Sequence, residues 1–150
     1  MKNNPKYKYD ISIIILNYNR VHFLDRSIRS CSDQILFNKS TEIIFMDDGS
    51  TDNSINYAKE LKIPNLKIFS NSKNKGIGYS SKKAVNLCKG KYFIRVDSDD
   101  FLNSHALEMM SKILDANEEL AFVNCDHFRV DERGLKQKKI KVNTFKTLKD

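Results

Sequence analysis

Hydrophobic residues follow two patterns that alternate along the chain. Short runs rich in β-branched and aromatic residues favour strands, and the segments between them repeat apolar residues at helical spacing. The first helix is expected to run from Leu24 to Ile35. The runs expected to form strands are 11–16, 42–46, 66–69, 92–96 and 121–125. Parallel strands need a crossover connection, so this alternation predicts a mostly parallel central sheet flanked by helices.

The C-terminal part adds a hairpin to this α/β fold. Arg133 and Gly134 lie between residues 128–130 and the alternating segment 139–142, as at the turn of a β-hairpin. A chain of 150 residues is long enough to bury one hydrophobic core. We therefore expect residues 1–150 to form a single domain.

Polar clusters follow three of the expected strands. They occupy residues 17–20, 47–52 and 97–100. In sheets of this class, ligands bind beyond the carboxyl ends of the strands. One shared site is therefore a better interpretation than three unrelated turns.

The acidic cluster after 92–96 has two interpretations. Alternation along an extended backbone would direct Asp97 and Asp99 to one side and Asp100 to the other. Two neighbouring carboxylates are stabilised by a cation between them, and oxygen ligands suit Mg²⁺ or Mn²⁺. The alternative is a solvated acidic turn that caps the next helix.

Side chains in and near the other clusters also have two interpretations, one as ligand-binding groups and one as structural or surface residues. Tyr18 offers a flat face for a nucleobase, or it fills a packing position. Asp48 can accept an N–H from a base edge, or it belongs to a turn beside Gly49. Several lysines either face a diphosphate or lie on a solvated surface: Lys73, Lys75, Lys82 and Lys83.

Charge and cysteine usage restrict the class of protein without choosing a ligand. The net charge of +7 favours anionic partners such as nucleotide phosphates, nucleic acid or an acidic membrane surface. Three widely spaced cysteines fit buried thiols in a reducing compartment better than a disulfide framework or a metal site. We expect a cytoplasmic protein with peripheral contact at the inner face of a membrane.

Two other site types are excluded by spacing. Gly76-Ile77-Gly78 is not a dinucleotide-binding loop, because Ser81 stands at the third glycine position and the segment does not follow the first strand. The histidines are too scattered for zinc or a catalytic triad; they are His22, His105 and His127.

Taken together, several segments resemble the N-terminal, nucleotide-sugar-binding part of the family-2 inverting glycosyltransferases, which have the GT-A fold. The similarity covers roughly Ile11 to Asn124, in matching order and spacing. The block Asp47-Asp48-Gly49-Ser50-Thr51-Asp52 is the most specific part. The segments that carry the resemblance are 13–20, 42–52, 74–76, 90–92 and 97–100.

The resemblance implies a nucleotide-diphospho-sugar donor, usually a UDP-sugar, and a divalent metal, Mg²⁺ or Mn²⁺. By position, Tyr18 would stack on the base and Asp48 would bind its edge. Asp97 would lie near the ribose or the metal, and Asp99 would bind the metal. The residues expected to hold the nucleotide sugar are Leu16, Tyr18, Arg20, Asp48, Asp97 and Ser98, and those expected at the metal are Asp97, Asp99 and Asp100.

The chain departs from the family pattern in three places. Leu16 replaces a usual proline. Ser81-Lys82 replaces a frequent arginine-asparagine pair, which leaves Lys82 or Lys83 as substitutes at the diphosphate. The family's general base lies in a later acceptor-side motif, so no catalytic base is assigned. The acidic residues not assigned to that role are Asp126, Asp131 and Glu132.

We therefore expect the donor-binding half of a glycosyltransferase that transfers a sugar, with inversion, to a glycan or lipid-linked acceptor. The acceptor part is expected in a missing C-terminal segment or a partner chain. The alternatives are a nucleotide-sugar-binding module without transfer, a nucleotidyltransferase, and a basic nucleic-acid-binding domain. A nucleic-acid-binding domain would not explain acidic clusters at three strand ends, so no specific nucleic-acid partner is expected.

Overall fold

The structure, a computed structural model, describes residues 6–142. The chain divides into two compact units, one that ends at Met109 and one that begins at Met110. A single domain over residues 1–150 stays a prediction.

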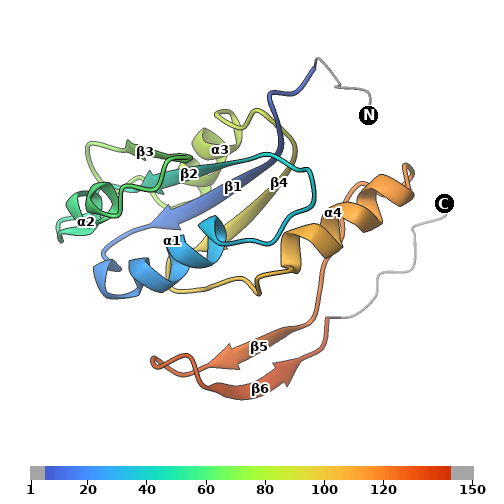
Figure 1. Cartoon of the computed structure of the whole chain (residues 1–150). Helices are drawn as coiled ribbons and strands as arrows, with labels where there is room; N and C mark the ends of the chain where they lie inside the picture. Colours follow the sequence, from blue (N-terminus) through green and yellow to red (C-terminus); the bar gives the residue numbers. More distant parts are fainter. Residues whose placement is uncertain (1–5, 143–150) are drawn as a thin grey trace. The chain divides into compact units, whose positions relative to one another are not determined.

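The first unit is built on a four-stranded parallel sheet (Figure 1). The strands are β1 (Tyr9–Asn17), β2 (Thr41–Asp47), β3 (Leu66–Ser70) and β4 (Gly90–Asp97), in the spatial order β3-β2-β1-β4. The helices of this unit are the 3₁₀ helix η1 (Val21–Phe23), α1 (Leu24–Ser32), α2 (Ser54–Glu60) and α3 (Ile77–Val85), and α4 (Ala106–Ala116) begins in it. The predicted parallel sheet with flanking helices is confirmed, although α1 ends before Ile35, which is exposed.

Helices cover both faces of this sheet, which explains the unbroken hydrophobic runs of its central strands. Ile13 and Ile15 of β1 belong to a cluster with residues of α1 and α2. Ile14 and Leu16 belong to a second cluster, with Ala84 of α3. Figure 1 shows α1 and α2 on one side of the sheet and α3 on the other. Because β1 is buried on both faces, its carboxyl end is a rigid support for the polar turn that follows.

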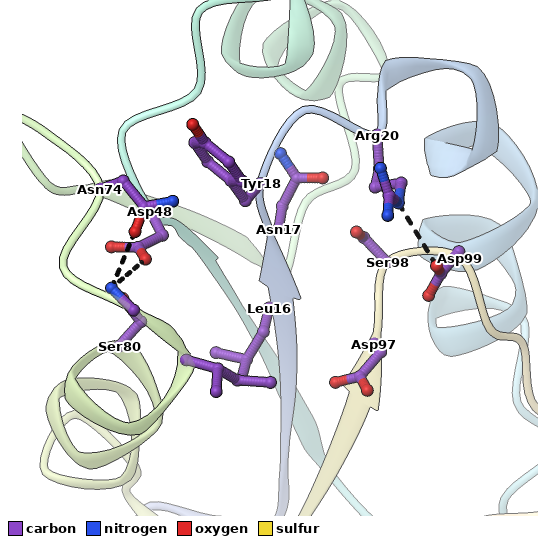
Figure 2. Close-up of a pocket in the computed structure, with 12 residues that line it drawn as sticks. Leu16, Asn17, Tyr18, Arg20, Asp48, Asn74, Ser80, Asp97, Ser98 and Asp99 are labelled. Atoms are coloured by element: carbon purple, nitrogen blue, oxygen red, sulfur yellow. Dashed lines mark hydrogen bonds and ion pairs between the residues drawn. The ribbon is translucent and has the colours of Figure 1, made fainter.

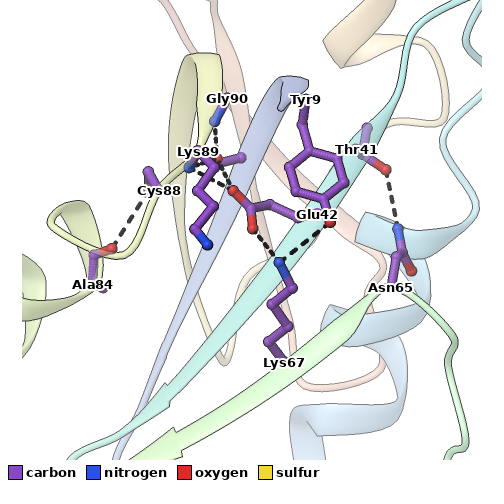
Figure 3. Close-up of polar contacts among 10 residues, drawn as sticks. Tyr9, Thr41, Glu42, Asn65, Lys67, Ala84, Cys88, Lys89 and Gly90 are labelled. Carbon is purple, nitrogen blue, oxygen red and sulfur yellow. Dashed lines mark hydrogen bonds and ion pairs between the residues drawn. The ribbon is translucent and has the colours of Figure 1, made fainter. Parts of the chain in front are cut away.

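A polar network, here called the Glu42 network, joins the amino ends of the strands (Figure 3). Glu42 is 1% exposed, and its Oε1 accepts hydrogen bonds from Ser12 Oγ and Lys89 N, both at 2.6 Å. Its Oε2 accepts from Lys67 Nζ at 2.6 Å. Burial raises the pKa of Glu42, but the hydrogen bonds from Lys67, Ser12 and Lys89 outweigh it, and the pKa lies below its ordinary value. The hydrogen bond to Glu42 raises the pKa of Lys67.

The second unit contains the predicted hairpin. Strands β5 (His127–Val130) and β6 (Lys136–Ile140) pair antiparallel, with Gly134 at φ +84° in the turn. The predicted fifth strand is wrong: residues 121–125 form no strand, and Phe122 is 65% exposed. Strand propensity describes how well residues suit a paired, half-buried position, and this segment has no strand partner among residues 6–142. Within the same residues, no helix is both long and apolar enough to span a membrane.

Candidate functional site

A cavity of about 260 Å³ lies in the first unit, at the carboxyl ends of β1, β2 and β4 (Figure 2). It brings together seven of the eight residues that the sequence predicted for donor or metal binding; Asp100 does not line it. Figure 2 shows Asp48 and Asp99 on opposite sides of the cavity, with Leu16 between them. The lining residues are Leu16, Asn17, Tyr18, Arg20, Asp48, Asn74, Gly76, Ile77, Ser80, Asp97, Ser98 and Asp99.

The turn after β1 is fixed by its own asparagines. Asn19 adopts a left-handed conformation, with φ 52°, which asparagine tolerates better than most residues. Its Oδ1 accepts hydrogen bonds from Thr51 N at 2.8 Å and Asp52 N at 3.3 Å. This turn is therefore tied to the loop after β2, and the tie sets where Tyr18 projects. Tyr18 is 43% exposed and lines the cavity.

The loop after β2 is organised by Asp47 and Gly49. The Asp47 carboxylate is buried and accepts hydrogen bonds from Asn17 Nδ2 at 2.8 Å and from Ser50 Oγ at 2.6 Å. Gly49 has φ +72°, and a Cβ there would lie 2.4 Å from the backbone carbonyl carbon of Lys73. Only glycine allows this approach. The loops after β2 and β3 are therefore in direct backbone contact beside the cavity.

Asp48 is held by the loop after β3. Its Oδ1 accepts hydrogen bonds from Asn71 Nδ2 at 2.7 Å and Lys75 N at 3.0 Å, and its Oδ2 accepts from Gly76 N at 2.8 Å. Burial raises the pKa of Asp48, but the hydrogen bonds from Asn71, Lys75, Ser80 and Gly76 outweigh it, and the pKa lies below its ordinary value. Asp48 is thus an ionised, acceptor-only group in the cavity wall.

The other end of the cavity carries the acidic pair. Asp97 Oδ1 is a buried atom that makes no hydrogen bond within residues 6–142, although Arg95 Nε lies 3.4 Å from it. Asp99 Oδ2 lies 3.4 Å from Arg20 Nε, and both side chains are about half exposed. Asp100 is exposed, and its backbone N–H donates to Asp97 O at 2.9 Å, which closes the turn.

The carboxylate oxygens in this cavity suit a metal ion that binds together with the phosphates of a substrate. No group of three or more His, Cys, Asp or Glu side chains in residues 6–142 is arranged to hold a metal ion. Mg²⁺ is commonly held by only one or two carboxylates, together with waters and substrate phosphates. Asp97 and Asp99 provide two carboxylates on one cavity, and Asp97 Oδ1, which accepts no hydrogen bond within residues 6–142, is a candidate ligand atom. The residues therefore fit the divalent metal that the resemblance implied.

Sequence reasoning missed several lining residues, of which Asn17 is the most informative. Asn17 is 3% exposed, and its Nδ2 donates to Asp47 and Ser50. Its Oδ1 makes no hydrogen bond within residues 6–142, and Figure 2 shows this oxygen directed toward the side of Ser98. The position of Asn17 at the end of β1 was the available signal. The other missed lining residues are Asn74, Gly76, Ile77 and Ser80.

The lysines expected at a diphosphate do not line this cavity. Lys82 is exposed on α3. Lys83 Nζ donates hydrogen bonds to Asn71 Oδ1 at 2.8 Å and to Ser70 O at 3.3 Å. Lys83 thus contacts the loop after β3, behind Asp48. Its role as a diphosphate ligand stays a prediction, and the structure offers it a different function.

A parallel sheet with acidic turns around one cavity defines a nucleotide-binding α/β domain of the GT-A type. The chain belongs to glycosyl transferase family 2, whose sequence profile matches residues 12–149. It is 34% identical over 125 residues to chondroitin synthase from Escherichia coli, over 83% of this chain and 18% of that protein. It is 39% identical over 106 residues to cholesterol galactosyltransferase from Borreliella burgdorferi, over 69% of this chain and 29% of that protein.

Solved structures agree with this assignment. The crystal structure of S. aureus TarS 1-349 in complex with UDP matches with a TM-score of 0.68 and 25% identity, over 73% of this chain and 33% of that chain. The family resemblance and the GT-A fold predicted from the sequence are thereby confirmed. The chain spans between 18% and 33% of the length of these three relatives.

Proposed function

We propose that this chain is the donor-binding half of an inverting glycosyltransferase, and that it holds a UDP-sugar together with Mg²⁺ or Mn²⁺. The observation that carries the proposal is the cavity itself, which has an aromatic ring and a buried carboxylate at one end and two carboxylates at the other. This arrangement matches a ligand with a flat base and an anionic diphosphate. The family membership and the TarS complex with UDP support the same ligand class.

At the base end, Tyr18 stacks on the nucleobase and Asp48 accepts an N–H from its edge. Leu16 and Asn17 form the floor beneath the nucleoside, at the carboxyl end of β1. Uracil carries an N–H at position 3, whereas cytosine has only an acceptor there. At position 3, an ionised carboxylate therefore meets a donor in uracil and a lone pair in cytosine.

At the diphosphate end, Asp97 and Asp99 hold the metal, and Ser98 and Arg20 line the same wall. The bound metal would neutralise charge on the leaving nucleoside diphosphate. Arg20 is paired with Asp99 in this structure. Its guanidinium would either keep this ion pair or bind a phosphate of the ligand. Asp97 Oδ1 contributes an acceptor that no protein N–H within residues 6–142 satisfies.

The acceptor is proposed to be a glycan or a lipid-linked molecule, and the general base is not assigned within this chain. Asp126 is a poor base, because the hydrogen bond from Lys139, at 2.9 Å, lowers its pKa. Asp131 Oδ1 accepts hydrogen bonds from Arg133 N and Leu135 N in the hairpin turn. Both carboxylates thus have structural partners.

A cytoplasmic location, with peripheral contact at the inner face of a membrane, is part of the proposal. Its support is limited to composition: a net charge of +7 favours anionic surfaces, and three free cysteines suit a reducing compartment.

Calorimetric titration with UDP, in the presence and absence of Mn²⁺, tests the proposal. We expect UDP affinity to rise with Mn²⁺ in the wild type and in a Glu60→Ala control on α2, and not in Asp99→Ala. Asp100→Ala is expected to keep the rise, since Asp100 does not line the cavity. Tyr18→Ala is expected to weaken UDP binding by about 1–3 kcal/mol, the range measured for base stacking on aromatic residues. A wild-type chain that binds unrelated polyanions as well as UDP, with no response to metal, contradicts the proposal.

A further inference from the structure

The Asn71 side chain is held in one orientation from both of its ends. The side chain is 8% exposed, and its Nδ2 donates to Asp48 Oδ1 at 2.7 Å and to Ser80 Oγ at 2.9 Å. A primary amide has a donor end and an acceptor end of nearly the same shape. Rotation by about 180° would turn the Asn71 carbonyl toward the Asp48 carboxylate. The acceptor-only Asp48 opposes that rotation at one end of the amide, and a donor beside the oxygen would oppose it at the other.

Lys83 is placed to do so. Its Nζ donates to Asn71 Oδ1 at 2.8 Å and to Ser70 O at 3.3 Å, so the ammonium contacts both the side chain and the backbone of the loop. An ammonium group has donors only. The end of the amide next to Lys83 must therefore be the oxygen, and the end next to Asp48 must be the N–H.

The spacing on α3 shows why this lysine, and not its neighbour, has that position. Ser80 is buried, and Lys83 follows it by three residues, so the two side chains are neighbours on the helix surface. Lys82, with the same charge, is exposed. The two lysines form a matched pair for experiment.

We propose that Lys83, acting through Asn71, is a positioning residue that fixes the Asp48 carboxylate and thereby sets the selectivity of the site for uracil over cytosine nucleotides. This inference rests on the proposed function, because it takes Asp48 as the group that meets the base edge. Lys83 does not line the cavity. It holds the oxygen end of the amide, and the other end donates to the carboxylate proposed to meet the base.

The consequence of losing Lys83 follows from the same contacts. In Lys83→Met, Asn71 Oδ1 loses the donor from Lys83 and only the Asp48 end still orients the amide, so the N–H that faces the carboxylate is held less firmly. Hydrogen bonds to charged groups are stronger than neutral ones, so a loss of about tenfold in UDP affinity is expected. Cytosine has no N–H at position 3 to donate to the Asp48 carboxylate, so the affinity for cytidine nucleotides should change less.

The experiment compares dissociation constants for UDP and CDP, by calorimetry with Mn²⁺, in the wild type, Lys83→Met, Lys83→Arg and Lys82→Met. We expect the ratio of the CDP to the UDP dissociation constant to fall by about tenfold in Lys83→Met. Lys82→Met should keep the wild-type ratio, and Lys83→Arg should recover most of it, because a guanidinium also donates to the amide oxygen.

A pH series adds a readout that general loosening of the fold would not produce. Without the Asn71 donor, the pKa of Asp48 rises, so UDP binding in Lys83→Met should weaken on acidification at a higher pH than in the wild type. The inference is overturned if Lys83→Met and Lys82→Met have the same ratio, or if Lys83→Met weakens UDP and CDP equally. Failure of the wild type to bind UDP contradicts the proposed function instead, which keeps the two failures distinct.

Discussion

Replacing Lys67 with methionine should destabilise the protein, and the loss should depend on pH. Lys67 Nζ is one of three donors at 2.6 Å from the carboxylate of Glu42, which is 1% exposed. Removing one partner of a buried ion pair typically costs about 3–5 kcal/mol. The Lys67 side chain is 37% exposed, so water can replace part of the lost interaction. We therefore expect a loss of about 2–3 kcal/mol in the free energy of unfolding at pH 7.

The pH dependence has a definite sign. In the wild type, the folded-state pKa of Glu42 lies below its unfolded value, so the carboxylate adds stability above pH about 4.3 and loses it as the pH falls through the folded pKa. In Lys67→Met, burial is less opposed and the folded pKa of Glu42 rises. The penalty is then largest at pH 7 and shrinks toward pH 4, where Glu42 binds a proton.

Equilibrium urea denaturation at pH 7 and at pH 4.5 measures both effects. Lys59→Met, on the exposed side of α2, is the matched control for loss of one positive charge and should change the free energy of unfolding by less than about 0.5 kcal/mol. The reasoning is refuted if Lys67→Met matches Lys59→Met at pH 7. An equal loss at both pH values would show that packing of the lysine stem, and not the charge of Glu42, is responsible.

Two further predictions concern the glycines and the cysteines. Gly90→Ala would place a Cβ 2.5 Å from Ser12 N, so we expect a loss of about 1–3 kcal/mol in urea denaturation. Gly78→Ala, whose Cβ would meet open space outside its own helix backbone, should cause no loss. Burial raises the pKa of Cys31 to about 12, whereas Cys125 is exposed, so a disulfide reagent at pH 8 should modify Cys125 quickly and Cys31 only on unfolding. A fast phase that persists when Cys125 and the half-buried Cys88 are both replaced by serine would contradict the second prediction.

The sheet could be predicted from the sequence because burial on both faces leaves a simple signature. Ile11 to Leu16 is a nearly continuous apolar run, and β1 is the strand that α1 and α3 cover from opposite sides. Residues 121–125 have a similar composition and form no strand. Composition shows that a segment suits a strand, and only the rest of the fold decides whether it has a partner.

The location of the candidate site could be predicted from the sequence, but the residues that support it could not. Parallel strands bring their carboxyl ends to one edge, so clusters at 17–20, 47–52 and 97–100 had to converge. The residues that support them could not be found in this way. Asn71 and Asp48 are 23 residues apart, and their hydrogen bond depends on a close approach of two loops at Gly49. Nothing in the local sequence of Asn71 marks that contact.

A carboxylate near each end of β2 is linked to a lysine by hydrogen bonds. Lys67 contacts Glu42 directly, at the amino end, whereas Lys83 reaches Asp48 through Asn71, at the carboxyl end. Glu42 does not line the cavity, so losing Lys67 should lower stability and leave the preference for UDP over CDP unchanged. Asp48 does line the cavity, so losing Lys83 should change that preference at a smaller cost in stability. Measuring both quantities on both variants therefore separates a carboxylate that stabilises the sheet from one that recognises a ligand.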